Sequence, residues 1–150
     1  MKSKTFKSFD EVDKEKFKQL IKSGFGKTLV DWYFNYVNPK YIHIIENGLE
    51  YIGAIVIEDA ALGFDYLDKI VVASSYKGNG YGNQLWDKLI GNSKKLLWRA
   101  NKANPFNKFY NKHCTGMQKV GKWNIYWVGL TPSQLKDGIK YALSKKETLE

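Results

Sequence analysis

The sequence has few of the residues that build disulfides and metal centres. Its 150 residues include one cysteine, Cys114, and two histidines, His43 and His113. A single cysteine excludes an internal disulfide, and these scattered residues lack the clustered spacing of a zinc site. We therefore expect no metal cofactor. We also expect no acyl-enzyme on Cys114, because no activating base accompanies it.

Long hydrophobic runs are missing as well. No apolar stretch approaches the roughly 18 residues that a membrane-spanning helix needs, and the first 16 residues contain no hydrophobic signal core. We therefore expect a cytoplasmic protein without membrane contact. Hydrophobic residues make up 43% of the chain and aromatic residues 15%. This composition predicts one folded domain over residues 1–150, with loose ends at 1–8 and 145–150.

The charge is strongly one-sided, with a formal net charge of +9. The lysines are spread along the chain and form no dense basic block. A phosphorylated cofactor or a dicarboxylate substrate would suit this charge as well as a nucleic acid would. Nucleic acid is the less favoured partner, because binding to it is typically marked by clustered basic residues.

The hydrophobic pattern predicts an α/β domain of α+β-like character, in which helices flank a single mixed sheet. An Asn47-Gly48 pair predicts a type I′ hairpin turn, and Ser8 with Glu11 predicts a capping box at the first helix. The expected strands are 41–46, 49–57, 65–72, 96–99 and 123–128. The expected helices are 9–22, 28–37, 85–90, 106–113 and 133–144, and a loop is expected to start at 115–116.

The clearest chemical pattern is a glycine-rich loop after the central strand. Residues 77–82 read KGNGYG, and a helical pattern begins at Leu85. A strand, a glycine-rich loop and a helix together offer free backbone N–H groups and a positive helix end to a phosphate. The glycine spacing fits neither a Walker loop nor a dinucleotide fingerprint. A flexible turn without a ligand is the simpler alternative.

The loop resembles the acyl-CoA motif Q/R-x-x-G-x-G/A of the GCN5-related N-acetyltransferases, with Lys77 in the first position and Gly80 and Gly82 as the glycines. Three further segments carry a more specific resemblance: FGK at 25–27, YLDK at 66–69, and LWRANKANPFNKFYNKHCTG at 97–116 with KWNIYWVGL at 122–130. Together they resemble the N-acetyltransferase domain of vertebrate-type N-acetylglutamate synthases and of bifunctional synthase/kinase proteins. The resemblance covers roughly residues 8–145 and implies the GCN5-related N-acetyltransferase fold.

The resemblance implies acetyl transfer from acetyl-CoA to the α-amino group of L-glutamate, the first step of arginine biosynthesis. It assigns the glutamate carboxylates to Lys27, Lys69 and Arg99, with Tyr66 nearby. It places Asn104 and Tyr110 beside the thioester sulfur. The cofactor-binding positions that it implies are Val71, Val72, Lys77, Gly78, Asn79, Gly80, Tyr81 and Gly82.

Two positions depart from the family pattern. Asn101 stands where a second arginine is common, and Phe109 replaces a usual tryptophan. The missing cation leaves open an acceptor other than glutamate, or another short acyl-CoA, unless Lys102 substitutes for it. A non-catalytic module that binds CoA or nucleic acid is the alternative of another class. The family's kinase domain is absent from the sequence, so a homodimer or a separate N-acetylglutamate kinase chain is compatible with the resemblance.

Overall fold

The structure is a computed structural model that describes residues 1–150. A single mixed sheet of seven strands has the order β1-β2-β3-β4-β5-β7-β6, which confirms the predicted fold class. The chain divides into two compact units. Unit 1 comprises Met1–Glu58, Lys69–Asn92 and Lys146–Glu150, and unit 2 comprises Asp59–Asp68 and Ser93–Lys145. No helix is both long and apolar enough to cross a membrane.

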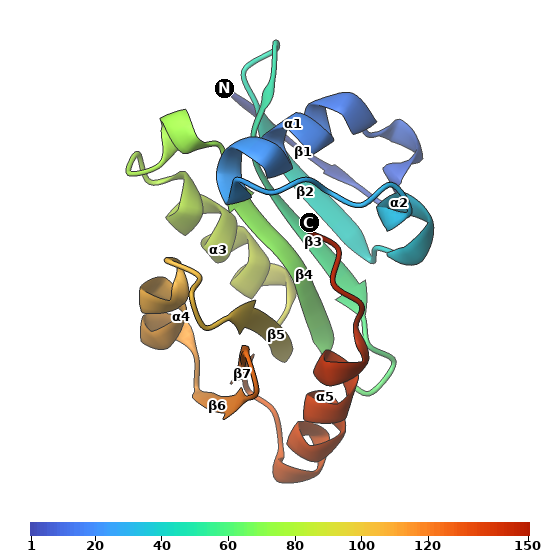
Figure 1. Ribbon diagram of the computed structural model, residues 1–150, viewed down its shortest axis with the longest axis vertical. Coiled ribbons are helices and arrows are strands. Elements are labelled where there is room, and N and C mark those ends of the chain that lie inside the picture. Colours follow the sequence, from blue (N-terminus) through green and yellow to red (C-terminus); the bar gives the residue numbers. More distant parts are fainter. The chain divides into compact units, whose positions relative to one another are not determined.

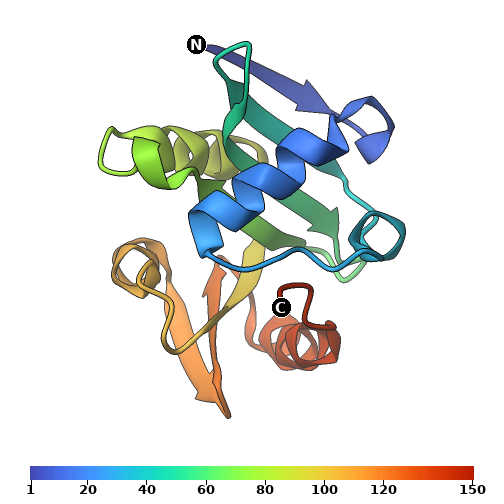
Figure 2. The ribbon, with the colours of Figure 1, turned by 45° about the horizontal axis from the view of Figure 1, so that its top comes forward.

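Unit 1 packs helices on both faces of its strands (Figures 1 and 2). Its elements are β1 (Lys2–Phe6), α1 (Lys14–Phe25), α2 (Tyr33–Tyr36), β2 (Tyr41–Glu46), β3 (Tyr51–Asp59), the second half of β4 (Asp65–Val72) and α3 (Tyr81–Asn92). Strand β2 pairs antiparallel with both β1 and β3. The inner strands are apolar on nearly every residue because both of their faces are covered.

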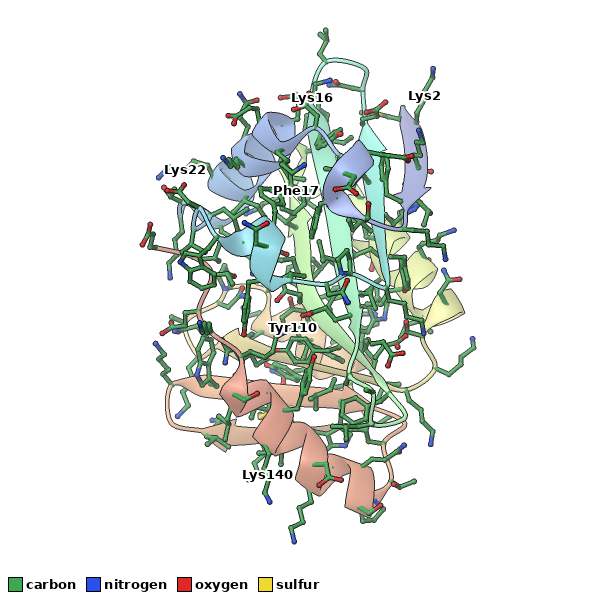
Figure 3. All side chains as sticks on the ribbon, turned by 90° about the vertical axis from the view of Figure 1, so that its right-hand side faces the viewer. Lys2, Lys16, Phe17, Lys22, Tyr110 and Lys140 are labelled. Carbon is green, nitrogen blue, oxygen red and sulfur yellow. The ribbon has the colours of Figure 1, made fainter.

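Neighbouring residues of β3 show how the two faces are divided. Ala54 belongs to the buried cluster that includes Phe17 of α1. Gly53 faces Leu85 of α3, and an added Cβ at Gly53 would lie 3.1 Å from the Leu85 Cδ1 atom. Successive strand residues point to opposite faces, so α1 and α3 cover opposite sides of β3. In Figure 3, Phe17 points from α1 toward these strands.

The N-terminal expectations need three corrections. Residues 1–8 are not loose, because β1 forms an edge strand on β2. The expected helix at 9–22 is a short 3-10 turn at Phe9–Glu11 followed by α1. Ser8 caps the turn, while Asp13 caps α1 by accepting from the Lys16 N–H at 3.1 Å. The apolar residues keep a helical spacing through the 3-10 turn, which made the two elements look like one helix. The residue that caps α1, Asp13, lies five residues after the expected cap, Ser8.

The segment after α1 also differs from expectation. The helix expected at 28–37 is limited to α2, because residues 28–30 pair instead with residues 148–150. The end of the chain, expected to be loose, is therefore ordered, and Thr148 is buried. The loop between β2 and β3 is not a type I′ turn, since Gly48 has a positive φ and Asn47 does not. Instead, the Asn47 Oδ1 atom accepts from two backbone N–H groups within a four-residue loop.

Unit 2 packs two helices against its strands. Its elements are the start of β4, β5 (Leu96–Asn101), α4 (Asn107–His113), β6 (Gly116–Val120), β7 (Trp123–Val128) and α5 (Pro132–Ser144). Strand β5 runs parallel to β4 at the pairs Asp65↔Leu96 and Tyr66↔Leu97, and β7 runs antiparallel to β5 and β6. The expectations for β5, α4, β7 and α5 are confirmed. Strand β6 was expected to be a loop.

Candidate active site

The glycine-rich loop lies between β4 and α3 in unit 1. A short 3-10 turn at Ser74–Tyr76 follows β4, and Gly78 and Gly80 then adopt φ values of 85° and 87°. This left-handed conformation favours glycine, so both residues are needed for the path of the loop. The loop connects a buried strand to a helix start, as the acyl-CoA motif requires.

Helix α3 begins earlier than expected. It starts at Tyr81 rather than near Leu85, and it continues through Gly91 to Asn92. Tyr81 and Gly82 therefore lie in the first helical turn and not in the loop. This turn contains no acidic residue, so its backbone N–H groups and the positive end of the helix dipole are not opposed by a local carboxylate. The arrangement suits a phosphate ligand.

The loop is fastened to the end of α1. The Lys77 ammonium donates to the Gly24 carbonyl at 2.8 Å, and the Ser74 N–H donates to the Ser23 hydroxyl at 2.9 Å. Gly24 also lies against β4, because a Cβ added there would lie 2.8 Å from the Val72 carbonyl oxygen. The end of β4, its following loop and the end of α1 are thus held together in one unit.

Val71 and Val72 are buried in β4. The Val71 side chain belongs to the core cluster that also contains Phe17 and Tyr33. Their side chains therefore serve packing, and any contact with a cofactor would have to come through their backbone.

The two predicted acceptor lysines of unit 1 have different environments. Lys27 is exposed and directly follows Gly26, the residue that caps α1. Lys69 is only 8% exposed. Its ammonium donates to the Thr148 hydroxyl at 2.6 Å and lies 5.3 Å from the centre of the Tyr33 ring. Thr148 and Tyr33 were not identified from the sequence, because neither belongs to a motif.

Arg99 and Tyr66 are fixed in unit 2. The Arg99 guanidinium donates to the Ala142 carbonyl at 2.8 Å and stacks 4.0 Å from the centre of the Trp123 ring. Tyr66 is buried and meets the ring of Tyr141 edge to face at 5.2 Å. Trp123 also packs against the core cluster of unit 2, so it supports both the core and the arginine. A cation held in this way keeps one orientation, which recognition of a carboxylate requires.

Asn104 organises the approach to α4. Its Oδ1 atom accepts from the Phe106 N–H at 2.9 Å, and its carbonyl accepts from the Asn107 N–H at 3.1 Å. The side-chain oxygen thus shapes the turn, whereas the Nδ2 amide makes no hydrogen bond and can face a ligand. Phe106 also packs edge to face against Tyr110 at 5.1 Å, which connects the two predicted catalytic residues.

Tyr110 lies in a nest of aromatic rings. Its ring centre is 5.5 Å from that of Trp98 and 5.2 Å from that of Tyr126. The side chain is buried, yet its hydroxyl makes no hydrogen bond, whereas the Tyr126 hydroxyl donates to the Asn107 Oδ1 atom at 2.9 Å. Burial, and secondarily the neighbouring Tyr126, raises the pKa of Tyr110 well above its usual range. Tyr110 therefore remains protonated at neutral pH and can act as a hydrogen-bond donor.

Adjacent residues of β5 divide these groups between its two faces. Trp98 packs against Tyr110, while Arg99 packs against Trp123 and donates to α5. Because side chains alternate along a strand, the aromatic nest and the arginine lie on opposite faces of β5. Figure 3 shows Lys140 on the outer side of α5.

The remaining chemical candidates contribute little to this site. Asn101, at the position of the family's second arginine, accepts from the Ala103 N–H at 2.9 Å and so forms a turn. Burial raises the pKa of the Cys114 thiol, which disfavours the nucleophilic thiolate. No group of three or more histidine, cysteine or acidic residues lies close enough to hold a metal ion.

Comparison with known proteins gives a consistent result. The model of a family described as NAT, the N-acetyltransferase of N-acetylglutamate synthase, matches residues 4–144. The mitochondrial N-acetylglutamate synthase of Homo sapiens is 34% identical over 125 residues, which cover 83% of this chain and 23% of that protein. A protein named acetylglutamate kinase from Xanthomonas campestris is 31% identical over 147 residues, covering 95% of this chain and 34% of that protein. The chain thus spans about a quarter to a third of these relatives.

Solved structures support the fold. A GNAT-family acetyltransferase from Desulfovibrio desulfuricans has a TM-score of 0.64 at 15% identity, covering 85% of this chain and 98% of that one. The N-acetylglutamate synthase from Neisseria gonorrhoeae, complexed with coenzyme A and N-acetyl-glutamate, has a TM-score of 0.62 at 10% identity, covering 85% of this chain and 35% of that one. The fold is therefore that of the GNAT acetyltransferases. With the match over residues 4–144, this chain belongs to the family of N-acetyltransferase domains of N-acetylglutamate synthase.

Proposed function

We propose that this chain transfers the acetyl group of acetyl-CoA to the α-amino group of L-glutamate, the first step of arginine biosynthesis. The observation that carries the proposal is the family match over residues 4–144, because it includes every residue assigned to the site. The relative from Neisseria gonorrhoeae binds coenzyme A and N-acetyl-glutamate, the products of this reaction.

The donor half of the reaction is assigned to unit 1. The backbone of Val71 and Val72 is proposed to hold the pantetheine arm. The N–H groups of the glycine-rich loop and of the first turn of α3 are proposed to hold the pyrophosphate. No acidic residue opposes an anion in that turn, and Lys77 adds a positive charge to the loop.

The acceptor half requires cations that orient a small dicarboxylate. Lys69 and Arg99 are each fixed by a hydrogen bond and by an aromatic ring. A hydrogen bond between charged groups contributes about 1.5–3 kcal/mol, so a few such contacts can hold the amine in place for attack. Lys27 is the third proposed cation, and Tyr66 is a further proposed acceptor contact.

In the proposed chemical step, the neutral amine attacks the thioester carbonyl and forms the C–N bond. The tetrahedral intermediate then loses the C–S bond, and the sulfur leaves as a thiolate. Tyr110 hydrogen-bonds this thiolate, since its raised pKa keeps the hydroxyl protonated. The amine proton passes to water and the thiolate takes up a proton, so the products are the amide and the free thiol. The Asn104 Nδ2 amide is proposed as a second donor beside the sulfur.

One observation favours a second candidate. Asn101 supplies a turn oxygen where relatives of this type commonly carry a cation. An acyltransferase that acts on another small amine, or uses another short acyl-CoA, would tolerate that loss. Lys102 is exposed next to it and would be the replacement cation if glutamate is the acceptor.

A thiol-release assay with acetyl-CoA tests these readings against a panel of amino acids. We expect release with L-glutamate and a product with the mass of N-acetylglutamate. Release only with another acceptor would refute the glutamate assignment. No thiol release with any amine, despite CoA binding, would indicate a non-catalytic module.

The remaining expectations are part of the same proposal. A homodimer or a separate N-acetylglutamate kinase chain is the proposed protein partner, because the relative from Xanthomonas campestris is named as that kinase. We retain a cytoplasmic location for this chain, although the relative from Homo sapiens is named as mitochondrial. Size-exclusion chromatography with light scattering, and imaging of the tagged chain in its own cell, test these two expectations.

A further inference from the structure

Residues Lys146–Glu150, which we call the strap, run antiparallel to the segment that follows α1. The Val30 N–H donates to the Thr148 carbonyl at 2.9 Å. Thr28 and Glu150 exchange two backbone hydrogen bonds, of 2.8 and 2.9 Å. In Figure 1 the strap is the red end of the chain within unit 1, on the same side of the strands as α1 and α2.

Side chains hold the strap at both ends. The Lys146 N–H donates to the Tyr36 hydroxyl at 2.9 Å, and its ammonium lies 5.6 Å from the ring centres of both Trp32 and Tyr36. Leu149 bridges to Leu29 and packs against the core cluster of unit 1. The strap therefore has a defined place in unit 1.

Thr148 connects the strap to the chemistry of β4. Its side chain is only 5% exposed, and its hydroxyl accepts from the Lys69 ammonium at 2.6 Å. An ammonium on a flexible stem has three donors and rotates freely unless its partners fix it. The Tyr33 ring supplies one constraint on Lys69, and the Thr148 hydroxyl supplies a directional one.

We propose that Thr148 is a positioning residue for the acceptor substrate, acting through Lys69. This inference rests on the proposed function and deepens it by adding the strap to the acceptor site. The strap also holds the backbone next to Lys27, because both hydrogen bonds with Glu150 are made by the following residue, Thr28. It thus connects two predicted acceptor cations that lie 42 residues apart in the sequence.

Two substitutions at one position test the proposal. Thr148→Val keeps the shape of the side chain and removes the hydroxyl, whereas Thr148→Ser keeps the hydroxyl. For Thr148→Val we expect KM for the acceptor to rise about tenfold, with kcat and KM for acetyl-CoA changed by less than about twofold. Thr148→Ser should return KM for the acceptor to near the wild-type value, which a purely structural role would not predict.

Thr5→Val is the matched control. The Thr5 hydroxyl forms a 2.8 Å hydrogen bond to the His43 ring on the β1–β2 edge, so this variant also loses one side-chain hydrogen bond of unit 1. We expect its kinetic constants to match those of the wild type. Melting temperatures of all variants show whether Thr148→Val has lost more than the hydrogen bond.

The outcomes separate the two proposals. If wild type acetylates glutamate and Thr148→Val has an unchanged KM for it, the inference about Thr148 is wrong and the proposed function stands. If the wild type uses another acceptor, the proposed function is wrong. The effect of Thr148→Val on the KM for that acceptor then tests the inference. An equal rise in the KM for acetyl-CoA, or no rescue by Thr148→Ser, would also overturn the positioning role. A wild type that acetylates no amine refutes both.

Discussion

Removing the Tyr110 hydroxyl should slow the reaction without weakening the fold. Tyr110→Phe keeps the ring, which is packed by Trp98, Phe106 and Tyr126. The hydroxyl makes no hydrogen bond in the protein, so its loss leaves no partner unsatisfied. We therefore expect the free energy of unfolding to stay within about 0.5 kcal/mol of the wild-type value.

The size of the kinetic effect follows from the raised pKa of Tyr110. An ordinary thiol has a pKa near 8.5, whereas burial lifts that of Tyr110 above the ordinary value of about 10. Complete proton transfer to the departing thiolate is therefore uphill, and the main contribution is a hydrogen bond to a charged sulfur. Such a bond is worth about 1.5–3 kcal/mol, which corresponds to a fall in kcat of about 10- to 150-fold.

Tyr126→Phe provides the control for this prediction. The Tyr126 hydroxyl donates to Asn107 and accepts from the Asn124 amide at 3.3 Å, and both amides lose a partner in the variant. We expect a loss of about 1–3 kcal/mol in unfolding free energy and a smaller change in kcat than for Tyr110→Phe. Urea titrations and steady-state thiol-release assays on both variants should show the larger loss of stability in Tyr126→Phe and the larger loss of kcat in Tyr110→Phe.

The pH dependence supplies the decisive test. Since the pKa of Tyr110 is raised, the hydroxyl stays protonated across the range from about pH 6 to about pH 9 and should contribute no basic limb to kcat there. A basic limb in that range that disappears in Tyr110→Phe would refute the donor role. A large rise in KM for acetyl-CoA with unchanged kcat would show that Tyr110 binds the donor and does not assist its departure.

Three further changes are predicted. Gly24→Ala places a Cβ against the Val71 side chain and 2.8 Å from the Val72 carbonyl, so urea titration should show a loss of about 1–3 kcal/mol; Gly91→Ala, in open space on α3, should be neutral or slightly stabilising. Lys77→Met should raise KM for acetyl-CoA by about two- to fivefold at low ionic strength, and the difference from wild type should shrink as salt is added. Burial, and secondarily Lys88, lowers the pKa of His43 in the folded protein below its ordinary value near 6.5. The free energy of unfolding of the wild type should therefore decrease as the pH falls from about 6.5 toward this lower pKa. An equal decrease in His43→Gln would show that other groups cause it.

The buried elements of this fold could be predicted from the sequence, whereas its edges could not. Strands β3 and β5 are apolar along most of their length, and their burial follows directly from that pattern. Strands β1 and β6 lie at the two ends of the sheet order, and most of their residues are at least partly exposed. An edge strand is stabilised by backbone hydrogen bonds to its neighbour, which leave little trace in side-chain composition.

The candidate site shows the same division. The glycine-rich loop and Tyr110 could be identified because they belong to motifs. Thr148 could not, since its significance depends on backbone pairing with residues 28–30, far away in the sequence. The burial of Lys69 was equally hidden, because lysine is solvated in most sequence contexts. Only the fold places a hydroxyl and an aromatic ring around that ammonium.

The register of β5 determines how the proposed donor and acceptor groups of unit 2 are separated. Arg99 is paired with Ile125, and Trp98 with Tyr126, so the arginine and the aromatic nest face opposite ways. A slip of one residue would exchange these faces and bury the guanidinium where Trp98 now packs. Leu97 and Ile125 oppose such a slip, because both are fully buried in the cluster beneath α5. The apolar residues between the site residues are therefore what keeps the arginine and the tyrosine on opposite faces of the strand.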